Sequence, residues 1–123
     1  MFGFKNNRKQ EEAVVQRVQF LHEQDGISEQ ILKGDLNKFF TTVPAVDRAY
    51  LAIVSYNNRK SFDVALCLRA MVNTENEKQA LVKVIGEIFA KLFKKDAHLD
   101  TLFLKDTQEN ELIKVCKPFY SKK

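Results

Sequence analysis

The chain has 123 residues with a formal net charge of +4, 45% hydrophobic residues and 29% charged residues. This length leaves no material for a second domain, and this composition excludes wholesale disorder. The two cysteines are too few and too far apart for a disulfide scaffold or an unaided zinc site, and they fit a reducing cytosol. No apolar run is long enough for a signal peptide or a membrane span, so we expect neither.

The N-terminal third of the chain is predicted to be helical. Between Glu11 and Gln24 the apolar residues recur at helical spacing, which predicts an amphipathic helix that stops at Asp25. Ser28 then offers an N-cap for a second helix with its own apolar stripe. This second helix should end before Pro44, because the residue that precedes a proline is disfavoured in helical conformation.

A β-hairpin is predicted in the middle of the chain. The segments Asp47 to Tyr56 and Ser61 to Val72 are rich in β-branched and aromatic residues, and the polar residues 57–60 join them. From Phe62 onward, every second side chain of the second segment is apolar and points to one face. We expect that face to belong to the core.

A capped helix should follow the hairpin. Thr74 and Glu77 match a capping box, so the helix is predicted to begin at Glu75 and to continue to about Lys94. Gly86 lies inside this helix, where glycine costs about 1 kcal/mol relative to alanine. We therefore expect close packing of the helix on the sheet at Gly86.

A strand and a short helix complete the order of elements. Residues 101–105 predict the strand, and residues 106–109 offer a cap for a helix that ends before Pro118. The order α-α-β-β-α-β-α predicts an α+β domain, with a hairpin plus a third strand in a small mixed sheet and about four helices. A right-handed crossover should place the third strand parallel to the second strand of the hairpin.

One domain is expected over residues 11–120, between a basic mobile tail over 1–10 and a short tail over 121–123. Residues 1–10 and 117–123 each carry a charge of +3, which leaves −2 for residues 11–116. The net positive charge of the chain therefore comes from its two ends. This makes nucleic acid an unlikely ligand and favours a contact with another protein.

The second face of the hairpin is too apolar for an ordinary solvent face. Its candidate binding residues are Tyr50, Tyr56, Asp63, Arg69 and Met71. We favour an account in which the two N-terminal helices cover this face, so that helices lie on both sides of the sheet. The alternative is an open surface on which those five residues bind a peptide, another protein or a second copy of the chain.

The sequence contains no established catalytic motif, and we expect no catalytic residue, cofactor or metal. Asp96, His98 and Asp100 are types that bind metals or move protons. However, they lie in a connection between a helix and a strand, where polar residues are ordinary. Cys67 and Cys116 have apolar neighbours and are predicted to pack in the core.

The leading functional interpretation is a non-catalytic protein–protein interaction module that binds another protein or forms a homodimer. Three alternatives stay open: a small nucleic-acid-binding domain, a partner that neutralises a toxin, and a small enzyme. The first is motivated by the basic charge alone, and in such a domain Tyr50 and Tyr56 could stack on bases. The enzyme would need groups among Asp63, Arg69, His98 and Asp100 to converge in one pocket.

Three segments together resemble a known family. They are Val46 to Ala52 at the start of the hairpin, Leu99 to Leu104 after the capped helix, and Lys117 to Tyr120 near the end. Their order and spacing are similar to those of the C-terminal domain of the enhanced serine sensitivity (SseB) family, over about residues 28–120. The resemblance implies a cytoplasmic bacterial protein with an α+β fold, and it implies no catalytic residue.

Overall fold

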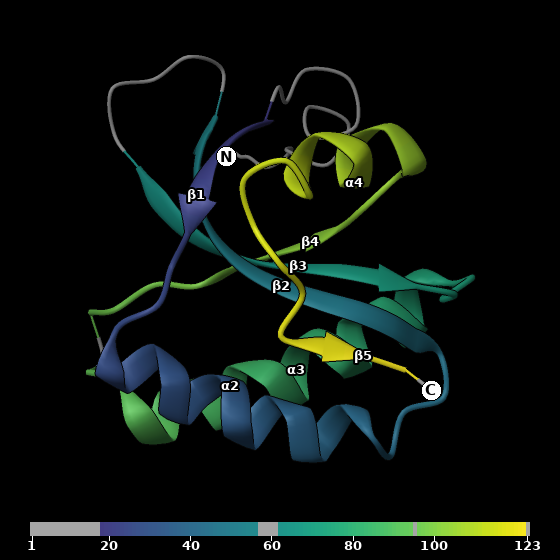
Figure 1. Ribbon diagram of the computed structural model, residues 1–123. Coiled ribbons are helices and arrows are strands. Elements are labelled where there is room, and N and C mark those ends of the chain that lie inside the picture. Colours follow the sequence, from purple (N-terminus) through teal and green to yellow (C-terminus); the bar gives the residue numbers. More distant parts are fainter. Residues whose placement is uncertain (1–17, 57–61, 95, 123) are drawn as a thin grey trace, which may run out of the picture.

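The computed structural model describes residues 18–56, 62–94 and 96–122, and these residues form a five-stranded sheet and three helices (Figure 1). The predicted α+β class is confirmed. In chain order the elements are β1 (Val18–Glu23), α2 (Ile27–Phe40), β2 (Val46–Tyr56), β3 (Asp63–Ala70), α3 (Glu75–Leu92), β4 (Asp100–Phe103), α4 (Asp106–Leu112) and β5 (Tyr120–Ser121).

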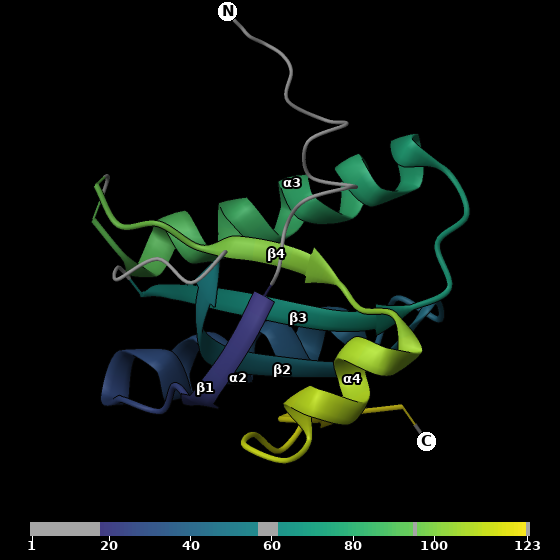
Figure 2. The same ribbon diagram turned by 90° about the horizontal axis from the view of Figure 1, so that it is seen from above.

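The sheet is built around β2. One side of β2 pairs antiparallel with β3, which confirms the predicted hairpin, and the other side is shared by β1 and β5. β4 pairs in parallel with the far side of β3, as the crossover through α3 predicts. The strands β1, β2, β3 and β4 therefore follow one another across the sheet (Figure 2).

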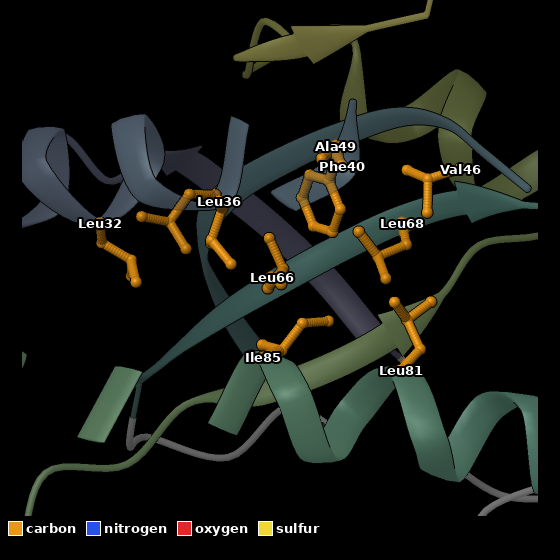
Figure 3. Packing of buried hydrophobic residues seen from close by; sticks show 10 residues of the cluster. Leu32, Leu36, Phe40, Val46, Ala49, Leu66, Leu68, Leu81 and Ile85 are labelled. Atoms are coloured by element: carbon orange, nitrogen blue, oxygen red, sulfur yellow. The ribbon is translucent and has the colours of Figure 1, made fainter. Parts of the chain in front are cut away.

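One face of the sheet is covered by α2 and α3, which Figure 1 shows beneath it. The face predicted as core is confirmed at Leu66 and Leu68, whereas Phe62, just before β3, is 63% exposed. Each of these two helices and of the strands β2 and β3 contributes two or three side chains to the buried cluster (Figure 3): Leu32, Leu36, Phe40, Val46, Ala49, Leu51, Leu66, Leu68, Leu81 and Ile85.

The opposite face of the sheet is covered by α4 and the turn that follows it. The prediction that two N-terminal helices cover this face was wrong, because α2 lies on the other face and the segment before it is a strand. The face is nevertheless covered, as we favoured. Its buried cluster combines hairpin residues with residues from the C-terminal part: Tyr50, Ala52, Val54, Tyr56, Ala65, Cys67, Leu104, Leu112 and Cys116.

The first predicted helix is contradicted where the structure describes it. Residues 11–17 lie outside the described residues, but Val18–Glu23 form the strand β1. Val18 and Phe20 alternate onto the second cluster, and the register then shifts between Phe20 and His22. This bulge interrupts the two-residue period of the strand, so the apolar spacing resembles that of a helix.

The start of α3 is as predicted, but the role of Gly86 is not. The Thr74 hydroxyl accepts a hydrogen bond from the Glu77 amide at 3.1 Å, and the Glu77 carboxylate accepts one from the Thr74 amide at 3.1 Å. Gly86 is exposed, and a Cβ atom there would meet nothing within 4 Å. The prediction that Gly86 permits close packing on the sheet was therefore wrong.

The C-terminal segment lies against the start of β2. Ser121 and Lys122, which the sequence assigns to a tail, are held there: Ser121 pairs with Arg48, and the Lys122 amide donates to the Asp47 carbonyl at 2.8 Å. The other predicted tail, residues 1–10, lies outside the described residues.

Candidate functional site

A cluster of charged side chains joins α4 to the end of the hairpin. Arg48 donates two hydrogen bonds to Glu109, from Nε to Oε2 at 2.6 Å and from Nη2 to Oε1 at 3.0 Å. The Tyr50 hydroxyl donates to the same Oε2 atom at 2.5 Å. Arg48 and Tyr50 reach one carboxylate because residues two apart in a strand point to the same face.

A second arginine completes the cluster from the neighbouring strand. Arg69 is the register partner of Arg48, so both guanidinium groups lie on the same face. Arg69 forms an ion pair with Asp106, and its Nε lies 3.7 Å from Glu109 Oε1. It also donates to the Leu104 carbonyl at 3.1 Å. The two adjacent positive charges are tolerated because two carboxylates of α4 neutralise them.

The sequence around α4 explains how Glu109 reaches this position. The Gln108 side chain accepts a hydrogen bond from the Lys105 amide at 2.9 Å, so the cap lies at Lys105, one residue before the predicted segment. Leu112 follows Glu109 by three residues and is fully buried, which turns that helix face toward the sheet. An apolar anchor and a carboxylate therefore dock α4 together.

The cluster shifts the pKa values of its members. The hydrogen bonds from Arg48 hold the pKa of Glu109 below its usual range, and the same bonds raise the pKa of Arg48. Burial, together with the hydrogen bond to Glu109, raises the pKa of Tyr50 to about 12. At neutral pH the cluster therefore holds an ionised carboxylate, charged arginines and a neutral hydroxyl donor, which is the pattern of a structural ion pair.

The structure separates the five predicted binding residues. Tyr50 is 1% exposed and Tyr56 is 8% exposed, and both belong to the second buried cluster. Tyr50 and Arg69 meet in the charged cluster of α4, whereas Asp63 lies at the opposite end of β3. Met71 follows β3 and is 74% exposed. A binding role for these residues stays a prediction.

Arg48 and Glu109 were missed from the sequence. The position of Arg48 could have been used to predict its place in the cluster, because it lies two residues before Tyr50 and therefore on the same face of the strand. No pattern in the sequence connects Glu109 to the cluster, because it lies 61 residues after Arg48 on a short polar helix. Only the docking of α4 brings its carboxylate to the sheet.

The polar connection before β4 is also tied to the second buried cluster. His98 Nε2 contacts Asp100 Oδ1, and the Tyr56 hydroxyl donates to Asp100 Oδ2 at 2.8 Å. Asp96 is exposed. Within the described ranges, the structure holds no group of three or more His, Cys, Asp or Glu residues suited to a metal ion. Asp100 accordingly serves as the acceptor for a buried tyrosine.

Both cysteines pack in the second buried cluster, as predicted, and both are free thiols. Burial raises the pKa of Cys67 above its usual range and raises that of Cys116 to about 11. The Cys116 thiol donates to the Leu51 carbonyl at 3.5 Å. Neither thiol is therefore activated as a nucleophile.

Among the described residues, no helix has the length and apolar character that crossing a membrane requires. Comparison with curated proteins and with solved structures gave no match. A family model described as the SseB protein C-terminal domain, however, matches residues 17–122. This match spans the sheet, the three helices and all three segments that carry the resemblance in the sequence. The chain therefore belongs to the SseB C-terminal domain family.

Proposed function

We propose that this chain is a non-catalytic protein-interaction domain that works in the bacterial cytoplasm. The observation that carries the proposal is a patch at the open end of the second sheet face, formed by Arg48, Arg69 and Met71 and called here the arginine–methionine patch. Met71 is 74% exposed, and the side chains of Arg48 and Arg69 remain 42% and 28% exposed. Arginine and methionine are both enriched in protein–protein interfaces.

The geometry of the patch supports a binding role. The Met71 amide donates to the Ala45 carbonyl at 2.8 Å, which continues the pairing of the hairpin beyond β3. Met71 therefore stands beside Arg69 on the second face, as alternation along a strand requires. The arginines are held rigidly by Glu109 and Asp106, so a partner that contacts them need not order two long side chains.

The chemistry beside the patch supports a non-catalytic role. Glu109 accepts hydrogen bonds from Arg48 and Tyr50 and has a lowered pKa, which suits a fixed anion and not a general base near pH 7. The free, buried state of Cys67 and Cys116 supports a reducing compartment.

Affinity capture from a lysate of the source bacterium tests this proposal. The baits are the wild-type chain, Met71→Ser and the control Phe62→Ser, which removes another exposed apolar side chain at the other end of β3. We expect a protein that wild type and Phe62→Ser retain and Met71→Ser loses. Calorimetry with that purified protein should then show at least about tenfold weaker binding to Met71→Ser. Identical sets of captured proteins for all three baits would contradict the proposal.

A further inference from the structure

The outer edge of β4 presents backbone groups that point away from the sheet. The Leu104 amide donates to the Leu68 carbonyl at 2.8 Å, while Leu68 is in register with Phe103. Backbone groups of alternate residues in a strand face the same neighbour, so Leu102 and Leu104 face β3. Thr101 and Phe103 turn their N–H and C=O groups to the outside, where no segment in the described ranges pairs with them.

This open edge is short and sharply bounded. At its C-terminal end the Lys105 amide donates to the Gln108 side chain at 2.9 Å, and the Lys105 carbonyl accepts from the Glu109 amide at 2.9 Å. The backbone of Lys105 is therefore already engaged by α4. Four outward groups remain, an N–H and a C=O on each of Thr101 and Phe103, which suit one short extended strand.

Two lysines flank the open edge on the side of α3. Lys78 Nζ lies 5.4 Å from the centroid of the Phe103 ring. Lys105 follows Phe103 by two residues in extended backbone, so it projects toward the same face of the sheet. No carboxylate in the described part of the chain forms an ion pair with either lysine. A strand added here would therefore meet two positive charges that no ion pair engages.

We propose that the β4 edge binds an extended acidic peptide segment of a partner protein. The segment adds to the sheet as one more strand, its backbone pairs with Thr101 and Phe103, and its carboxylates approach Lys78 and Lys105. This inference rests on the proposed role as an interaction domain. It uses a different surface from the arginine–methionine patch, so either can fail without the other.

The direct test is nuclear magnetic resonance titration of the full chain with a short, end-blocked peptide in which glutamate and valine alternate. We expect the largest shift changes at the Thr101 and Phe103 amides, and binding that weakens as salt is added. A matched peptide of alternating lysine and valine should bind at least about tenfold more weakly. Shifts confined to other residues, or equal binding of the two peptides, would overturn the proposal.

Variants separate the backbone contact from general damage. Thr101→Pro removes an outward N–H and no bond to β3, so the chain should fold and bind the acidic peptide at least about tenfold more weakly. Lys78→Glu should weaken binding as well, while Lys114→Glu, a matched charge reversal at an exposed lysine next to the C-terminal end of α4, should leave it unchanged. If Thr101→Pro does not fold, the wild-type titration and the binding of the peptide to Lys78→Glu test the proposal without it. Shifts at Thr101 that grow with protein concentration without peptide would assign the edge to a second copy and overturn the proposal.

Discussion

Arg48 on β2 and Glu109 on α4 stand 61 residues apart in the chain and meet through two parallel hydrogen bonds. This forked geometry fixes the orientation of the carboxylate as well as its position. Apolar packing of Leu112 holds α4 against the sheet but specifies its rotation only loosely. The Arg48–Glu109 pair fixes the rotation of α4. The Glu109 carboxylate also partly balances the charge of Arg69 on the next strand.

Glu109→Gln should destabilise the protein by about 2 kcal/mol, because it leaves two adjacent guanidinium groups with less compensating charge. Urea unfolding at neutral pH measures the change. Glu111→Gln is the matched control on the same helix, since Glu111 forms an exposed pair with Lys114. The control should change the free energy of unfolding by less than about 0.5 kcal/mol. Equal effects of the two substitutions would show that the partly buried Arg48–Glu109 pair contributes no more than a surface pair.

Stability should fall at acidic pH through the same carboxylate. The folded-state pKa of Glu109 lies below its unfolded value of about 4.3, so its ionised form contributes stability that is fully present above the unfolded pKa. That contribution is lost as the pH falls through the folded-state pKa. The difference in free energy of unfolding between wild type and Glu109→Gln should therefore shrink as the pH falls below about 5. A difference that stays constant as the pH falls would contradict the assignment.

Gly86→Ala should stabilise the protein by about 0.5 to 1 kcal/mol, because the site is helical, exposed and open to a Cβ atom. Gly34→Ala in α2 has the same surroundings and should act in the same direction. Gly26→Ala is the contrasting substitution, since alanine is a poorer N-cap and its Cβ would displace the end of the Glu29 side chain. Thermal unfolding of the three variants checks the order. Destabilisation by Gly86→Ala would mean that this helix face is covered in solution.

Neither cysteine should react with a thiol reagent in the native state at pH 8. Cys67 is fully buried and Cys116 is 4% exposed, and burial raises the pKa of both thiols. Both should react rapidly after unfolding in urea. Reaction of Cys116 in the native protein at the rate of a small free thiol would show that the turn after α4 opens readily.

Amide hydrogen exchange along β4 should alternate. The Leu102 and Leu104 amides face β3 and should exchange slowly, whereas the Thr101 and Phe103 amides face outward and should exchange at least about tenfold faster. Uniform protection of all four amides would show that another segment already occupies the edge.

Local signals in the sequence predicted the hairpin and the capped helix, and the right-handed crossover rule then predicted the parallel third strand. The hairpin and the helix rest on short-range patterns, such as the reciprocal contacts of Thr74 and Glu77. The helix predicted where β1 lies was wrong because a bulge between Phe20 and His22 breaks the alternation of the strand. The apolar residues then have a spacing that suits a helix. In a segment of six residues, the spacing of apolar residues cannot distinguish a bulged strand from a helix.

The candidate site was less accessible to prediction than the fold. Tyr50 and Arg69 were selected for their residue types, and both do lie in the charged cluster. The role of their partner Glu109 could not be predicted from the sequence, because tertiary packing decides which sheet face α4 covers. Burial of Tyr56 against Asp100 could not be foreseen for the same reason.

The shared edge of β2 has a consequence for how the chain comes to be folded. β1 and β5, from opposite ends of the described chain, pair with the same edge of one central strand. During synthesis, the β5 half of that edge stays unpaired until residues 120–121 have left the ribosome. Until then, the backbone groups of β2 that pair with β5 stay open to pairing with other strands.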